Sequence, residues 1–144
     1  MVNRKKFLGY FGEITRSTAK LSYCVKQKVG AIIVKDNRVI ATGYNGVPSG
    51  VDNSSGEYYL SDTKEIKTSK TVIHAEMNAI MQCAINGTPV KGASLVCTHS
   101  PCLSCSAAII QCGIEEVFFS EQHSDGAGIK FLKEHGVSVT KAEF

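Results

Sequence analysis

The second half of the chain alternates apolar strand-like segments with helical segments, and this alternation constrains the fold more than any other feature. Strands joined by helices pair in parallel, because the chain needs a crossover to return to the same end of the sheet. The crossover helices then cover the faces of that sheet. The segments are the strands ASLVCTH (93–99), EEVFF (115–119) and VSVT (137–140), and the helices 102–112, ended by Gly113, and GIKFLKEH (128–135).

The first part of the chain supplies a helix and a hairpin. Apolar residues at helical spacing predict a helix across residues 4–21. Two apolar runs, VGAIIV (29–34) and RVIATGY (38–44), predict strands joined by a tight turn at 35–37. A hairpin is antiparallel, so the complete sheet is expected to be mixed.

The middle of the chain is less regular. GYNGVPSG (43–50) is predicted to be a loop from its glycines and proline, and the polar residues 51–71 contain no clear strand. A helix is predicted from residue 74 to near Gly87. Its apolar side contains Met77, Ile80, Met81, Ala84 and Ile85, of which Met77 and Met81 are expected to be core residues.

These elements predict an α/β protein: a three-layer α/β/α sandwich with a mixed, roughly five-stranded sheet, in a single domain over residues 1–144. The 43% hydrophobic and 20% charged content agrees with a globular domain. A net charge of +3 with scattered Lys and Arg argues against a polynucleotide partner. No stretch approaches the roughly 20 apolar residues of a membrane span, and the N-terminus lacks a signal-peptide pattern. A cytoplasmic location is therefore expected, with the six cysteines as thiols or metal ligands.

The segment CTHSPCLSC (97–105) contains the strongest chemical pattern. Cys102 and Cys105 lie three residues apart at a predicted helix start, so both thiols face one side and are within reach of one ion. The helix N-terminus favours thiolates at that position. This spacing alone also fits a redox-active dithiol. Cys97 and His99 share one face of the preceding strand and are expected to be packing residues.

His74-Ala75-Glu76, at the start of the other predicted helix, favours a metal site. Two cysteines and one histidine leave the fourth position of a tetrahedral Zn²⁺ open for water, which is the catalytic arrangement rather than the closed structural one. Glu76 lies two residues from His74, off its helix face, and is the candidate base beside the metal. A structural zinc module would have no need for Glu76. The order His, spaced Glu, Pro-Cys-x-x-Cys is the signature of zinc nucleobase deaminases.

The chain resembles the deoxycytidylate (dCMP) deaminase family over three segments: KVGAIIVKDNRVIATGYNGVPSG (28–50), HAEMNAI (74–80) and SPCLSCSAAIIQCGIEEVFF (100–119). The resemblance implies a hydrolase that converts dCMP to dUMP and ammonia for dTMP synthesis, and a homohexamer. Some relatives carry a His-Cys pair after the glycine-rich loop for a second zinc. This chain has PSGVDNSSG there, so one Zn²⁺ per chain is expected.

The resemblance also implies residue roles. His74, Cys102 and Cys105 match the zinc ligands, and Glu76 matches the proton shuttle. Substrate contacts are expected from Asn45 at the sugar, from Lys26 near the phosphate, and from Ser22, Ala75, Ser100 and Pro101. His123 stands where the family often has a tyrosine.

The family is commonly activated by dCTP and inhibited by dTTP near the glycine-rich loop, where a triphosphate would bring Mg²⁺ with it. The candidate effector residues are Tyr44, Asn45, Gly46 and Asn78. Two other enzyme classes share the zinc motif, namely deaminases of RNA or DNA bases and deaminases of free nucleosides.

Overall fold

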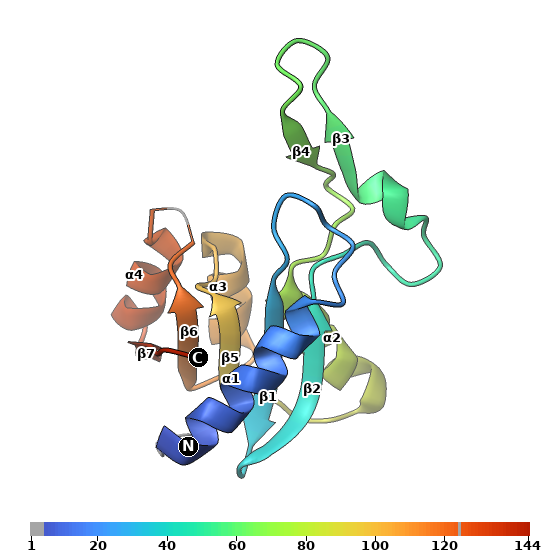
Figure 1. Ribbon diagram of the computed structural model, residues 1–144. Coiled ribbons are helices and arrows are strands. Elements are labelled where there is room, and N and C mark those ends of the chain that lie inside the picture. The colour runs from blue at the N-terminus through green and yellow to red at the C-terminus, as the bar shows by residue number, and fades with distance from the viewer. Residues whose placement is uncertain (1–4, 124) are drawn as a thin grey trace.

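The computed structural model describes residues 5–123 and 125–144, and its centre is a mixed five-stranded sheet (Figure 1). The strand order is β2-β1-β5-β6-β7. β1 pairs antiparallel with both β2 and β5, whereas β5, β6 and β7 are parallel, as the strand–helix alternation predicts. The bounds are β1 Gly30–Lys35, β2 Arg38–Tyr44, β5 Ser94–His99, β6 Glu116–Glu121 and β7 Ser138–Lys141.

Helices cover both faces of this sheet, which confirms the three-layer sandwich. One apolar cluster joins α1 to the sheet through Phe11, and the other joins three helices to the opposite face through Ala79, Ile109 and Leu132. The helices are α1 Lys5–Ala19, α2 Ala75–Asn86, α3 Leu103–Gln111 and α4 Ala127–Glu134. Residue 4, where the sequence places the first helix start, lies outside the described residues.

The central strands are apolar throughout because both of their faces are buried. In β1, Ile33 faces the cluster shared with α2, α3 and α4, whereas Ile32 and Val34 face the cluster under α1. The hairpin between β1 and β2 turns through Asp36 and Asn37, both at positive φ (52° and 59°). Two such residues form the turn type whose twist matches paired strands.

Residues 51–71 contain a second, separate hairpin, so the prediction of no strand there was wrong. A 3-10 turn, η1 (Asn53–Gly56), leads into β3 (Glu57–Tyr59), which pairs with β4 (Ile66–Thr68). Each strand has three residues and little burial, so neither shows an alternating apolar pattern. The hairpin projects from the body of the molecule beyond the end of the main sheet (Figure 1).

The large apolar residues of α2 are also placed differently from the prediction. Ile85 is 84% exposed and Met81 41% exposed, whereas the buried residues are Ala75, Glu76, Ala79 and Cys83. The helix lies very close to β2: a Cβ at Gly43 would stand 2.3 Å from the Ala75 carbonyl oxygen. Only small side chains fit between the two elements, so Met81 and Ile85 face outward, whereas Ile80 is partly buried against the core cluster.

Within residues 5–123 and 125–144, no helix has the length and apolar character needed to cross a membrane.

Candidate metal and substrate site

The three predicted ligands come together at one end of the sheet. The Nδ1 atom of His74 lies 3.5 Å from the Cys102 Sγ atom and 3.3 Å from the Cys105 Sγ atom. Tetrahedral Zn²⁺, with its usual bond lengths to sulfur and nitrogen, separates such ligand atoms by about 3.5 Å. The two sulfur–nitrogen distances therefore fit a zinc site, in which Nδ1 would be the ligand atom of the histidine.

The local backbone explains why these side chains are available for a metal. His74 is the N-cap of α2 and Cys102 is the N-cap of α3; both have extended backbone angles, and neither side chain caps its helix. Cys105 follows in the first turn of α3. Two helix N-termini thus point at one place, where their partial positive charge stabilises thiolates.

The thiols are strongly perturbed by one another and by His74. Hydrogen bonds from Cys105 and His74 lower the pKa of Cys102 to about 3. The same contact with Cys102, together with burial and the nearby Glu76, raises the pKa of the Cys105 thiol. The hydrogen bond with Cys102 raises the pKa of His74. The site therefore holds one ready thiolate, and a dication would favour the second. Both cysteines are free thiols in the structure.

Glu76 lies beside this group and is buried, with 4% exposure. Burial is the main cause that raises the pKa of its carboxyl above the ordinary value, partly offset by hydrogen bonding with Cys105. A carboxylate whose pKa is moved upward toward neutrality is suited to accept and return a proton. Glu76 is also on the wall of a cavity, so its carboxyl can reach a bound molecule.

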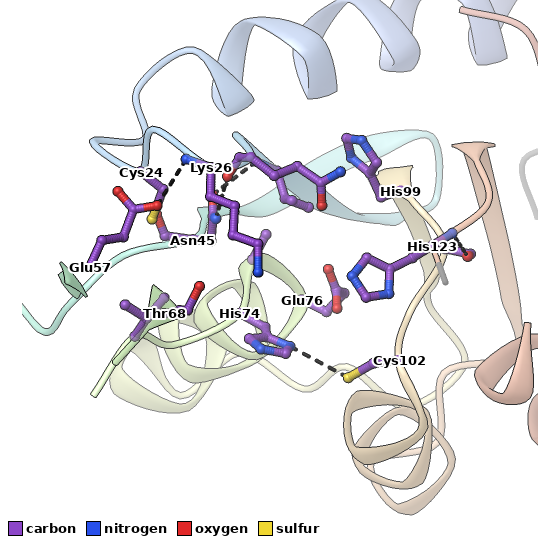
Figure 2. Close-up of a pocket in the computed structure, with 15 residues that line it drawn as sticks. Cys24, Lys26, Asn45, Glu57, Thr68, His74, Glu76, His99, Cys102 and His123 are labelled. Atoms are coloured by element: carbon purple, nitrogen blue, oxygen red, sulfur yellow. Dashed lines mark hydrogen bonds between the residues drawn. The ribbon is translucent and has the colours of Figure 1, made fainter. Parts of the chain in front are cut away.

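The cavity beside His74 and Cys102 has a volume of about 140 Å³ and is shown in Figure 2. It is bounded by the loop between α1 and β1, by the base of the β3–β4 hairpin, and by the starts of α2 and α3. Its polar and charged lining residues are Lys26, Gln27, Asn45, Glu57, Thr68, His74, Glu76, His99, Ser100 and His123.

The predicted substrate residues divide into two groups. Asn45, Lys26, Ala75 and Ser100 line the cavity. Ser22 and Pro101 are buried and are not lining residues. The Ser22 hydroxyl instead donates to the Asn45 carbonyl oxygen at 2.8 Å and accepts from the Cys24 amide at 3.2 Å, and it therefore shapes the loop that carries Lys26.

The side chain of Asn45 is engaged with this same loop. Its Oδ1 atom accepts from the Val29 amide at 2.9 Å, and its Nδ2 atom donates to the Gln27 carbonyl at 2.8 Å. Asn45 thus fixes the end of the α1–β1 loop as well as lining the cavity.

The candidate effector residues are also hydrogen-bonded within the fold. The Asn78 side chain donates to the Tyr44 carbonyl at 2.7 Å. The Asn45 and Gly46 amides donate to the carbonyls of Val29 and Ile73. Gly46 lines a smaller hollow next to the main cavity.

Sequence reasoning missed several lining residues. Glu57 and Thr68 belong to residues 51–71, where the sequence shows no clear strand, and Val72 follows that stretch; no local signal marks these residues. His99 was predicted to be a packing residue, but it lines the cavity, with its Nε2 atom 3.2 Å from a carboxylate oxygen of Glu121. Cys97, which was predicted to pack on the same strand, is fully buried.

His123 lies at the end of β6, and its backbone amide donates to the Ser100 hydroxyl at 2.7 Å. In Figure 2 its ring lies on the Glu76 side of the cavity. The residue that replaces the expected tyrosine therefore contributes to the wall near the metal-binding group.

Comparisons with known proteins agree with this geometry. Residues 6–121 match the family model described as cytidine and deoxycytidylate deaminase zinc-binding region. The chain is 40% identical over 136 residues to ComE operon protein 2 of Bacillus subtilis, covering 93% of this chain and 70% of that protein. It is 35% identical over 146 residues to deoxycytidylate deaminase of Saccharomyces cerevisiae, covering 98% of this chain but 46% of the yeast protein.

A solved structure is similar over nearly the whole length of both chains. The dCMP deaminase of cyanophage S-TIM5, in complex with dCMP and dUMP, superposes with a TM-score of 0.86 at 33% identity, covering 97% of this chain and 99% of that one. The family model covers most of the chain, and His74, Cys102 and Cys105 are the group of side chains that could hold the zinc named in its description. The chain belongs to the zinc-dependent cytidine and deoxycytidylate deaminase family, and it is a deaminase.

Proposed function

We propose that this protein hydrolyses dCMP to dUMP and ammonia and thereby supplies dUMP for dTMP synthesis. One observation carries the proposal: a single cavity is lined by His74, Cys102 and Glu76 on one side and by Lys26 on the loop that faces them. Figure 2 shows the Lys26 side chain extending into this space. The similar cyanophage and yeast proteins, which are named as dCMP deaminases, support this choice of substrate.

The chemistry follows from the residues around the cavity. One Zn²⁺ held by His74, Cys102 and Cys105 would supply an activated water as the nucleophile. Glu76 accepts a proton from that water and donates one to N3 of the cytosine ring. Once the water oxygen has bonded to C4, Glu76 takes the proton left on that oxygen and delivers it to the departing amine, so that the C4–N bond breaks, a C4 carbonyl forms and ammonia leaves. Its burial keeps competing bulk water away from the carboxyl during these transfers.

The remaining wall of the cavity is suited to hold a nucleotide. Lys26 presents an ammonium that matches a dianionic 5′-monophosphate as a point charge. Asn45 places its polar side chain on the same wall, and we assign it to the sugar. Ala75 and Ser100, next to the zinc ligands, are assigned to the pyrimidine.

The direct test is a comparison of three substrates with the purified zinc-loaded protein. Ammonia release is followed with dCMP, deoxycytidine and cytosine. The proposal predicts the highest kcat/KM for dCMP, because Lys26 can act only on a substrate that carries a phosphate. Equal rates for dCMP and deoxycytidine would assign the protein to the free-nucleoside deaminases. If none of the three reacts but a single-stranded polynucleotide added as a fourth substrate does, the protein belongs to the deaminases of RNA or DNA bases.

Regulation and assembly complete the proposal. We infer activation by dCTP with Mg²⁺ and inhibition by dTTP, at a site that includes Tyr44, Asn45, Gly46 and Asn78. The dCMP assay repeated with each triphosphate tests this, and unchanged rates would overturn it. We also propose a homo-oligomer, a hexamer by resemblance, and a reducing cytoplasmic setting, which agrees with the free thiols of Cys102 and Cys105.

A further inference from the structure

Glu57, the first residue of β3, makes a contact that joins the hairpin to the loop between α1 and β1. One carboxylate oxygen accepts a hydrogen bond from the Val25 amide at 2.7 Å, and the other accepts one from the Lys26 amide at 2.9 Å. The Lys26 contact is one of the dashed lines in Figure 2. These bonds connect segments more than 30 residues apart, and Glu57 itself lines the cavity.

The α1–β1 loop depends on such contacts because it has no regular structure of its own over residues 22–29. Its flanks are fixed by Asn45, which bonds to Ser22 on one side and to Gln27 and Val29 on the other. The middle of the loop is exposed, with Val25 at 74% exposure. Glu57 holds this middle part, which is also the part that carries Lys26.

Glu57 is itself well placed to act as an anchor. It is paired with Thr68 across the hairpin, and the Ser69 amide donates to the Gly56 carbonyl at 2.8 Å. A Cβ at Gly56 would lie 3.2 Å from the Val72 side chain, so the base of the hairpin packs on the segment that leads to His74. The hairpin therefore connects the Lys26 loop to the segment that carries the first metal ligand.

The charge of Glu57 also has a consequence for an anionic substrate. A carboxylate on the cavity wall would repel a phosphate, but two backbone N–H groups here offset its charge through charge-assisted hydrogen bonds. Consecutive backbone N–H groups are also donors that a phosphate can use. While Glu57 occupies them, the Lys26 ammonium is the cation that this part of the loop offers.

We propose that Glu57 is a positioning residue for the substrate phosphate: it holds the Val25–Lys26 backbone so that the Lys26 ammonium stays in the cavity. The assignment rests on the proposed dCMP deaminase function. It predicts that loss of Glu57 weakens recognition of the phosphate and leaves the deamination chemistry intact, because Glu57 does not contact the residues that move protons.

The test measures kcat and KM for dCMP and for deoxycytidine in Glu57→Ala and Glu57→Gln. For Glu57→Ala we expect KM for dCMP to rise about tenfold, the equivalent of one lost charge-assisted hydrogen bond. We expect kcat for dCMP and kcat/KM for deoxycytidine to stay within about twofold of wild type on the same reasoning. Glu57→Gln retains one acceptor oxygen and should lie between wild type and Glu57→Ala.

A matched control is Glu65→Ala, which removes a carboxylate from the same hairpin. Glu65 is exposed and pairs with Lys67, so its loss should leave both substrates unaffected. In a Lys26→Ala background, Glu57→Ala should raise the KM for dCMP little further, because both residues act through the contact between Lys26 and the phosphate. Amide hydrogen exchange at Val25 and Lys26 should be faster in Glu57→Ala.

The outcomes separate the two proposals. A wild-type protein without preference for dCMP over deoxycytidine overturns the proposed function and this assignment with it. If wild type prefers dCMP but Glu57→Ala impairs both substrates equally, Glu57 has only a structural role and the assignment alone is wrong. Tighter dCMP binding in Glu57→Ala would also overturn it, since the carboxylate would then compete with the phosphate for the two amides.

Discussion

Glu76 is the residue to which we assign the proton transfers, and its carboxyl is buried. Glutamine has nearly the same shape but cannot accept and return a proton, so Glu76→Gln should keep the fold and one zinc per chain. Turnover of dCMP should fall by about three orders of magnitude. The measurements are the deamination rate and zinc content of the same preparation. Activity near wild type would remove Glu76 from the mechanism.

His74 is predicted to be a metal ligand, and its substitution should therefore act on metal content first. His74→Ala leaves two thiols, which hold Zn²⁺ far less firmly than the full set. We expect wild type to bind one zinc per chain and the variant to bind well below one, by elemental analysis after dialysis. The control is His99→Ala, which removes another histidine of the cavity wall and should leave the zinc content at one.

At the residue scale, the sequence predicts what is determined by local geometry. A spacing of three at a helix start brings Cys102 and Cys105 together wherever the helix lies. The part played by Asn45 as a support of the α1–β1 loop, and the position of His99 on the cavity wall, depend on which distant segments come together. No local pattern contains that information.

At the element scale, the close approach of β2 and α2 determines where the metal ligands stand. A Cβ at Gly43 would lie 2.3 Å from the Ala75 carbonyl oxygen and 2.5 Å from the Ala79 amide nitrogen, and backbone atoms cannot move aside as a flexible side chain can. Gly43→Ala should force the two elements apart and lower the free energy of unfolding by about 1–3 kcal/mol. Because His74 begins α2, zinc affinity should fall as well.

The control for this prediction is Gly9→Ala on α1. Nothing lies within 4 Å of a Cβ at Gly9, which is exposed within the helix. Alanine favours a helix interior over glycine by about 0.8–1.0 kcal/mol, so this variant should be as stable as wild type or more stable. Chemical denaturation measures both variants. Equal stability of Gly43→Ala and wild type would show that the β2–α2 contact tolerates a side chain.

The two errors in predicting elements have physical causes. The β3–β4 hairpin has three-residue strands with little burial, so no period of apolar residues marks it. In α2, Met81 was expected to face the core, but Gly43 brings the strand so close that only small residues fit between the two elements, and Met81 and Ile85 face outward. Hydrophobicity alone does not report how much space a neighbouring element leaves.

At the scale of the whole molecule, the mixed sheet and the three layers follow from the order of elements. Strands separated by helices form the parallel part, and the initial hairpin forms the antiparallel part, as β5, β6 and β7 and the β1–β2 pair show. The position of β1 between β2 and β5 depends on long-range strand pairing, which the order of the elements along the chain does not determine. The cavity depends on it, because β1 brings the α1–β1 loop next to the starts of α2 and α3.

The exposed apolar face of α2 bears on assembly. Met81 and Ile85 lie on the outer side of the helix and are exposed to water in the single chain. In the proposed oligomer, we expect them to contact a second copy of this chain. Ile85→Lys places a charge in the middle of such an apolar contact, where it cannot be buried without a large cost. We expect the molar mass measured by light scattering to fall toward that of one chain. Gln111→Lys, which adds the same charge at an exposed position on α3, should leave the mass unchanged, and an unchanged mass in Ile85→Lys would place the contact on another surface.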